Sequence, residues 1–209
     1  ALDPNNSNDA LNEIAEEALN CLESLIKHCP REITNYIERL LEVAEKKMEY
    51  DPIYDYGEDE DMDVDDEGEG WDDEDFDEDE AQDDDSSWKV RRGSLNLIIS
   101  VITTRPEMLR DLYSNLSKRL IDRFKERENK TKNITVKIAL LECLAQVTLA
   151  LRDRLDPHFV EILPFIKESI IDEGNTAVIV PALQSLKTML QYAKKYDDYH
   201  KHSEEILEI

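Results

Sequence analysis

Glycine and cysteine are both scarce in this sequence, with 5 and 3 residues among 209. With so few glycines there is no Gly-rich strand pattern and no alternation of strands with helices. The cysteines Cys21, Cys29 and Cys143 form no CxxC pair, and Cys21 and Cys143 fall within apolar helical patterns. We therefore expect buried free thiols in a reducing compartment.

Motifs for catalysis or for a membrane anchor are missing as well. The sequence has no GxSxG, P-loop or HExxH motif, and its four histidines are scattered. A calcium-loop spacing between Asp63 and Glu74 lies in so acidic a run that we interpret it as a chance match. We predict no enzyme activity, no cofactor or metal site and no small-molecule substrate. Apolar runs fall short of the ~18 residues of a membrane span, and no signal peptide is visible.

Basic residues are outnumbered by acidic ones, 25 against 50, and the formal net charge is −25. This charge argues against nucleic acid or an anionic membrane as a partner. The segment 51–87 holds 22 of the carboxylates and no lysine or arginine, so the rest of the chain has a net charge of only −3. Because such dense like charges repel, we predict a disordered acidic insertion at 51–87. It is either a solvated spacer or an electrostatic arm that attracts a basic partner or covers a basic groove, with Trp71 and Phe76 as its anchors.

Apolar residues recur with helical spacing on both sides of the acidic segment. Two stripes precede it, one from Leu11 to Ile26 and one from Ile33 to Met48, with Cys29-Pro30 between them. The first stripe comprises Leu11, Ile14, Ala15, Ala18, Leu19, Leu22, Leu25 and Ile26. A connection this short predicts two antiparallel helices that bury their stripes against each other.

The same helix pair returns after the acidic segment. The candidate N-caps Ser87, Thr131 and Asn175 stand 44 residues apart, and helix pairs of ~40–47 residues are typical of HEAT and armadillo arrays. We predict an all-α HEAT-repeat α-solenoid of antiparallel helix pairs. The repeats lie at 1–50, 88–130 and 131–174, with a partial repeat at 175–209. The helices at both ends of such a stack should expose apolar surface.

A basic cluster lies in the second repeat and supplies the candidate partner-binding residues. These are Lys118, Arg119, Arg123, Lys125 and Arg127. Spacings of three and four residues place Arg119, Arg123 and Arg127 on one helix face. One interpretation is a solvated face with local acidic pairs. The other is a surface for an acidic partner, or a dock for the acidic segment.

Four segments between Tyr50 and Glu128 resemble a known family. They are 50–56 before the acidic run, the motif Trp88-Lys89-Val90-Arg91-Arg92 after it, 105–109, and 120–128. In this order they are similar to the CAND family, the cullin-associated, neddylation-dissociated proteins. Gly93 stands where we expect a small helix former such as alanine. The resemblance implies that the chain is an internal piece of a long HEAT solenoid.

The resemblance also implies a non-enzymatic function in the cytoplasm and nucleus. Members of the family wrap around an unmodified cullin and its RING subunit, mask the lysine that takes the ubiquitin-like modifier, and promote exchange of substrate-receptor adaptors. Their strongest contacts lie toward the two ends, so spacing is the role expected of middle repeats. Two alternatives remain. One is a nuclear transport receptor of the karyopherin β type, which also has HEAT repeats and an acidic loop. The other is an acidic histone-binding or chaperone module.

Overall fold

The computed structural model describes residues 4–50, 86–108, 120, 122, 133–152, 155, 158–171, 175–192 and 204, with side chains from residue 9 onward. These residues form α1 (Pro4–His28), η1 (Thr34–Tyr36), α2 (Ile37–Met48), α4 (Ser87–Thr104), α6 (Ile134–Leu151), α7 (Phe159–Ile171) and α8 (Thr176–Tyr192). Within these ranges there is no strand. The all-α prediction is confirmed.

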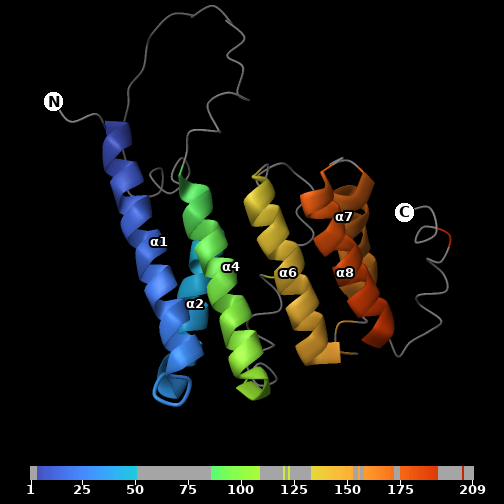
Figure 1. The fold of residues 1–209 in the computed structure, drawn as a ribbon, viewed down its shortest axis with the longest axis horizontal. Helices are drawn as coiled ribbons and strands as arrows, with labels where there is room; N and C mark the ends of the chain where they lie inside the picture. Colours follow the sequence, from blue (N-terminus) through green and yellow to red (C-terminus); the bar gives the residue numbers. More distant parts are fainter. Residues whose placement is uncertain are drawn as a thin grey trace, which may run out of the picture.

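The helices are arranged in two layers. The helices α1, α4, α6 and α8 lie side by side in one row, while α2 lies behind the α1–α4 end and α7 behind α8 (Figure 1). Along the row, α1 packs on α4, α4 on α6 and α6 on α8; in the second layer α2 packs on α4 and α7 on α8. The inner helices α4 and α6 therefore bury both flanks against their neighbours in the row, as in a HEAT-type stack.

The first helix pair differs from the prediction. Both α1 and α2 pack more closely on α4 than on each other. On α1, Leu19 and Ile26 are buried, whereas Leu11, Ile14 and Leu25 of the predicted stripe are 55%, 67% and 41% exposed. The reason is that α1 is apolar over two adjacent sides, and α4 covers only one of them.

The buried positions repeat along the row, but not at a constant interval. They are Val90, Ser94, Leu97, Ile98 and Val101 in α4, then Val136, Leu140, Cys143, Leu144 and Val147 in α6, and Val178, Ala182, Ser185, Leu186 and Met189 in α8. These sets are displaced by 46 and then by 42 residues. The predicted period of 44 is thus an average. A hydrogen bond from Ser185 Oγ on α8 to the carbonyl oxygen of Leu141 on α6, 2.7 Å long, joins two helices of the row.

Two of the three predicted N-caps are wrong by one or two residues. The N-cap of α6 is Asn133 rather than Thr131, and its side chain accepts hydrogen bonds from the N–H groups of two residues that follow it. At α4 the N-cap position is occupied by Ser86, and Ser87 is the first helical residue. Asn175 does cap α8, since its side-chain oxygen accepts a 3.0 Å bond from the N–H of Ala177.

Helix α6 contradicts the prediction that no apolar run is long enough to span a membrane. Among the described helices it is the one long and apolar enough, by length and composition, to cross a membrane. It lies between α4 and α8 in the row, with half of its residues buried (Figure 1). A core helix of a helical stack has the same properties.

The cysteines follow the prediction only in part. Cys143 is fully buried in α6, and burial raises the pKa of its thiol to about 12. Cys29 is half-buried, and Cys21 is exposed on α1. The prediction of burial was wrong for Cys21 because it lies on the side of α1 that α4 does not cover.

Candidate partner-binding surface

The motif Trp88 to Arg92 occupies the first turns of α4, where it faces α1. Val90 is buried, and Trp88 is half-buried against the core. The guanidinium of Arg92 lies 5.0 Å from the centre of the Trp88 ring. Arg92 Nη2 also donates a 2.8 Å hydrogen bond to Glu16 Oε1 on α1, with the two side chains 34% and 17% exposed. Arg92 of the motif therefore joins α4 to α1 and also packs on the Trp88 ring of its own helix.

Further polar contacts follow the seam between α1 and α4. Asn12 Nδ2 donates to Ser86 Oγ at 3.0 Å, and Ser86 Oγ donates to Asp9 Oδ1 at 2.6 Å. Toward the C-terminal end of α4, Ser100 Oγ donates a hydrogen bond to Glu23 Oε1 at 3.3 Å. These contacts fix the position of α4 along the axis of α1. They also hold Ser86, which directly follows the acidic run, against the first repeat.

Gly93 lies where α1 and α4 approach each other. A Cβ atom at this position would be 3.2 Å from Leu19 Cδ1 and 3.3 Å from Leu19 Cβ, which is tighter than ordinary van der Waals contact. The glycine thus replaces the expected alanine for a steric reason, since it leaves room for the Leu19 side chain.

Arg105 joins the ends of the first two repeats. Its Nη1 donates to the carbonyl oxygen of Pro30 at 2.7 Å and to Thr34 Oγ1 at 2.5 Å, while its Nε donates to Glu107 Oε1 at 2.6 Å. The hydrogen bond from Arg105 holds the pKa of the Glu107 carboxyl below its usual value. Sequence reasoning gave Arg105 no role beyond the family motif, because Pro30 and Thr34 are distant in sequence.

Other predicted sites lie outside the described residues. They include the five basic candidates Lys118, Arg119, Arg123, Lys125 and Arg127, and the acidic segment as far as residue 85. Next to the basic candidates, Leu120 is buried and Asp122 is exposed. The two interpretations of this cluster remain predictions. In the described part of the chain, no three His, Cys, Asp or Glu side chains are placed to hold a metal ion.

No family model matches the chain. Curated proteins do match it. Cullin-associated NEDD8-dissociated protein 2 of Mus musculus is 47% identical over 120 residues, which are 57% of this chain and 10% of that protein. Cullin-associated NEDD8-dissociated protein 1 of Dictyostelium discoideum is 40% identical over 186 residues, 81% of this chain and 15% of that protein. Cullin-associated NEDD8-dissociated protein 1 of Drosophila melanogaster is 40% identical over 121 residues, which are 58% of this chain and 10% of that protein.

This chain therefore spans between about a tenth and a seventh of the length of these relatives. The matched residues make up more than half of the chain in each comparison, at an identity of 40% or more. The resemblance seen in the ordered sequence motifs is confirmed, and the chain is related to a part of the CAND family, the cullin-associated NEDD8-dissociated proteins.

Proposed function

We propose that this chain is part of a non-enzymatic scaffold that regulates cullin–RING ubiquitin ligases. The observation that carries the proposal is the identity of 40–47% to proteins named as cullin-associated and NEDD8-dissociated. In the finer form of the proposal, the whole protein binds an unneddylated cullin with its RING subunit. It promotes exchange of substrate-receptor adaptors, in the cytoplasm and the nucleus.

The physical role we propose for this segment is to set a distance. A stack of helix pairs buries a continuous core between neighbours and leaves a long surface on which many weak contacts add up. In the described part of the segment, Arg92 and Arg105 bind to neighbouring helices or turns of the same chain. Cations engaged in this way keep the repeats in register, which a spacer between two binding ends requires.

A binding experiment with the full-length protein tests the proposal. We expect capture of an unmodified cullin–RING complex, loss of capture once the cullin carries NEDD8, and faster exchange of labelled adaptors when the protein is added. Capture of the small GTPase Ran together with a basic cargo, and of no cullin, would favour a transport receptor. Capture of histones alone would favour an acidic chaperone.

The basic cluster is tested separately. Reversing Arg119, Arg123 and Arg127 to Glu should weaken cullin–RING association, mainly through the association rate, if that face meets an acidic patch. The effect should shrink in high salt, since exposed charges are screened beyond ~8 Å at physiological ionic strength. Reversal of Arg31, Arg39 and Lys46, which are exposed on the first repeat, is the matched control, because it also reverses three cations. An unchanged association rate assigns the cluster to a solvated face and leaves the scaffold proposal standing.

A further inference from the structure

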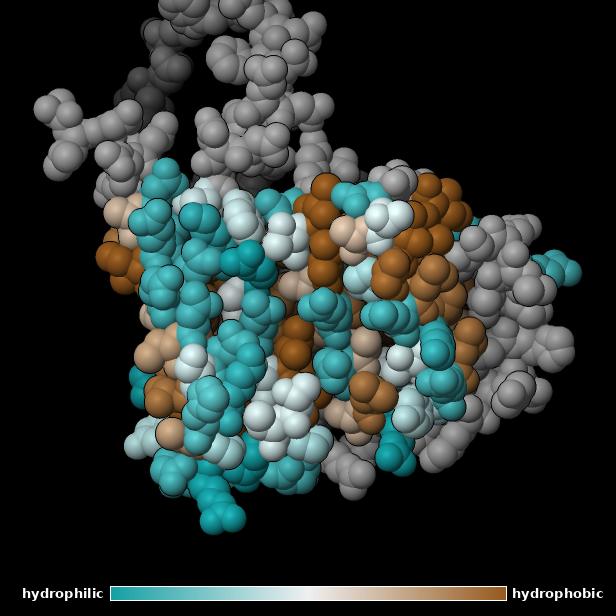
Figure 2. Space-filling model, viewed as in Figure 1, coloured by the Kyte–Doolittle hydropathy of each residue, from teal (hydrophilic) through white to brown (hydrophobic). Residues whose placement is uncertain are grey.

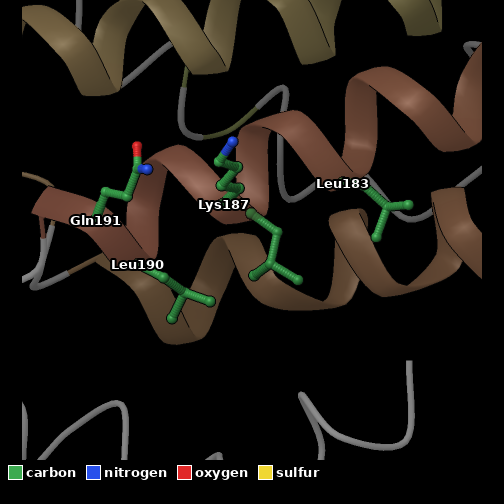
Figure 3. A pocket seen from close by; sticks show the side chains of 5 residues that line it. Leu183, Lys187, Leu190 and Gln191 are labelled. Carbon is green, nitrogen blue, oxygen red and sulfur yellow. The ribbon is translucent and has the colours of Figure 1, made fainter.

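The apolar hollow on α8 is explained by the repeat stack. Five residues line it, Leu183, Leu186, Lys187, Leu190 and Gln191. Figure 3 shows Leu183 and Leu190 pointing away from the helix axis. By the displacement of 42 residues, these two leucines match Leu141 and Thr148 of α6, which are buried in the row. The hollow is thus the flank on which a further helix would stack.

The connection between α1 and α2, residues 29–36, contains a threonine that contacts a cation. The connection lies at the end of the stack where α4 also ends (Figure 1), and the surface there is largely hydrophilic (Figure 2). Thr34 Oγ1 accepts a 2.5 Å hydrogen bond from Arg105 Nη1 and donates a 3.0 Å bond to the carbonyl oxygen of Pro30. Arg105 Nη1 also donates to this carbonyl oxygen, at 2.7 Å. The three groups meet where the first repeat touches the end of α4.

Other described hydroxyl groups have different partners. Ser86 donates to the carboxylate of Asp9, and Ser100 donates to that of Glu23. A further set donates to backbone carbonyl oxygens of its own helix, namely Ser94, Thr103, Thr104, Thr148, Ser169 and Thr188. A phosphate on Ser86 or Ser100 would therefore face a carboxylate, whereas a phosphate on Thr34 would face a guanidinium.

A phosphate on Thr34 would leave no polar group of this contact without a partner. Phosphorylation removes the hydroxyl proton, but the carbonyl oxygen of Pro30 keeps its hydrogen bond from Arg105. Nε of Arg105 donates to Glu107, and its Nη2 makes no hydrogen bond to another described residue. The phosphate oxygens would thus accept from Nη1 and Nη2 together, in the bidentate geometry typical of arginine with phosphate.

The residues before Thr34 match a charge pattern that basophilic protein kinases recognise. Arg31 stands three residues ahead of Thr34 and is exposed. Kinases of this class bind an arginine at that position through acidic side chains of their own. Thr34 itself is half-buried, whereas Asn35 and Tyr36 after it are exposed. Opening of a single turn between two helices therefore presents the hydroxyl group without separating the helices of the stack.

We propose that Thr34 is a phosphorylation site for a basophilic protein kinase and that Arg105 binds the phosphate. The kinase transfers the γ-phosphoryl group of ATP. The bond from Thr34 Oγ1 to phosphorus forms, the bond from phosphorus to ADP breaks, and the hydroxyl proton passes to the catalytic aspartate of the kinase. A group with a charge of about −1.5 to −2 then replaces a neutral hydroxyl. Its pairing with Arg105 stiffens the joint between the first two repeats, whichever partner the whole protein binds.

A second motif of the same kind provides an internal control. Arg91 stands three residues before Ser94, but Ser94 is fully buried in α4 and donates to the carbonyl oxygen of Val90 at 2.8 Å. The intact chain is incubated with ATP, Mg²⁺ and calcium/calmodulin-dependent protein kinase II, which recognises an arginine three residues before its target. Mass spectrometry should then locate phosphate on Thr34 and not on Ser94, whereas a synthetic peptide of residues 86–98 should be modified at Ser94. Absence of phosphate on Thr34, or equal modification of both residues in the intact chain, would overturn the proposal.

Two arginine variants separate recognition by the kinase from binding of the phosphate. Arg31→Gln should slow modification of Thr34 about tenfold or more, because the kinase loses its arginine contact, whereas Arg105→Gln should not slow it. Equal rates in the two variants would contradict recognition through Arg31.

Urea unfolding measures the contact with Arg105, with each variant compared with its own unphosphorylated form. Phosphorylation should raise the urea midpoint of the unaltered chain by about 0.3–0.5 M, because Arg105 binds the phosphate only in the folded state. Arg31→Gln should retain this increase after prolonged incubation with the kinase, and Arg105→Gln should lose it. A midpoint that phosphorylation lowers, or raises equally in both variants, would overturn the assignment of Arg105 as the phosphate ligand.

Discussion

Replacing Gly93 by alanine sets two effects of similar size against each other. In a helix interior, alanine is more favourable than glycine by ~1 kcal/mol. Its methyl group, however, would meet Leu19 Cδ1 at 3.2 Å and Leu19 Cβ at 3.3 Å. Cδ1 can turn away, but Cβ is fixed to the backbone of α1, so the two helices must separate by a few tenths of an ångström.

Overpacking of a core generally costs ~1–3 kcal/mol, and contacts only slightly too short lie toward the lower end of that range. We therefore expect Gly93→Ala to lower the free energy of unfolding by ~0–1 kcal/mol. In a Leu19→Gly background both the Cδ1 and the Cβ contact are gone, and a cavity is left beside α4. There the same substitution should raise the free energy of unfolding by ~1 kcal/mol. The two changes should thus be coupled by ~1–2 kcal/mol.

Urea unfolding of the four proteins in this cycle, followed by circular dichroism, measures that coupling. Ala139→Gly is a control, because Ala139 occupies the matching position of α6 and is buried. It should cost ~1 kcal/mol or more, as a glycine ordinarily does in a helix. If Gly93→Ala instead stabilises the chain by ~1 kcal/mol in both backgrounds, the close approach of α1 and α4 does not restrict residue 93.

Arg105→Lys should lower stability by ~1–3 kcal/mol, because one ammonium group cannot keep the hydrogen bonds that the guanidinium makes to Thr34 and its other acceptors; an unchanged urea midpoint would contradict this. Cys143 should react with a thiol reagent only after unfolding, whereas Cys21 should react at once, and equal rates would show that α6 opens readily. Since only the unfolded Cys143 ionises between its ordinary pKa of ~8.5 and the folded value of about 12, stability should fall as the pH rises through that range. Deleting residues 58–85 should leave the melting temperature nearly unchanged or raise it through relief of repulsion, and a large decrease would mean that the segment packs.

The described helices could be located from the sequence because their buried residues keep a helical period. The period could not show which side of a helix is covered by a neighbour when two adjacent sides are apolar, as in α1. Leu11 and Leu25 fit the expected stripe as well as Leu19 does, yet of these three only Leu19 is buried. Cap prediction failed at α6 for a similar reason, since Thr131 and Asn133 are both good capping residues and only the fold selects Asn133.

The contacts of the motif residues were beyond sequence reasoning for a different reason. Arg92 and Glu16, or Arg105 and Thr34, are more than 70 residues apart in the chain. No local pattern connects them, because the acidic segment separates α2 from α4 in sequence while α1 and α4 lie side by side in space.

Among the described helices, α4 is packed closely against three others, α1, α2 and α6, whereas α7 is packed closely against α8 alone. In terms of amide hydrogen exchange, this makes the two helices unequal. Hydrogens in α7 exchange when one contact surface opens, but those inside α4 exchange only when α1, α2 and α6 have all come away. Any ligand that stabilises one of these three helices therefore slows exchange in α4. One helix can thus report on binding at several separate surfaces of the segment.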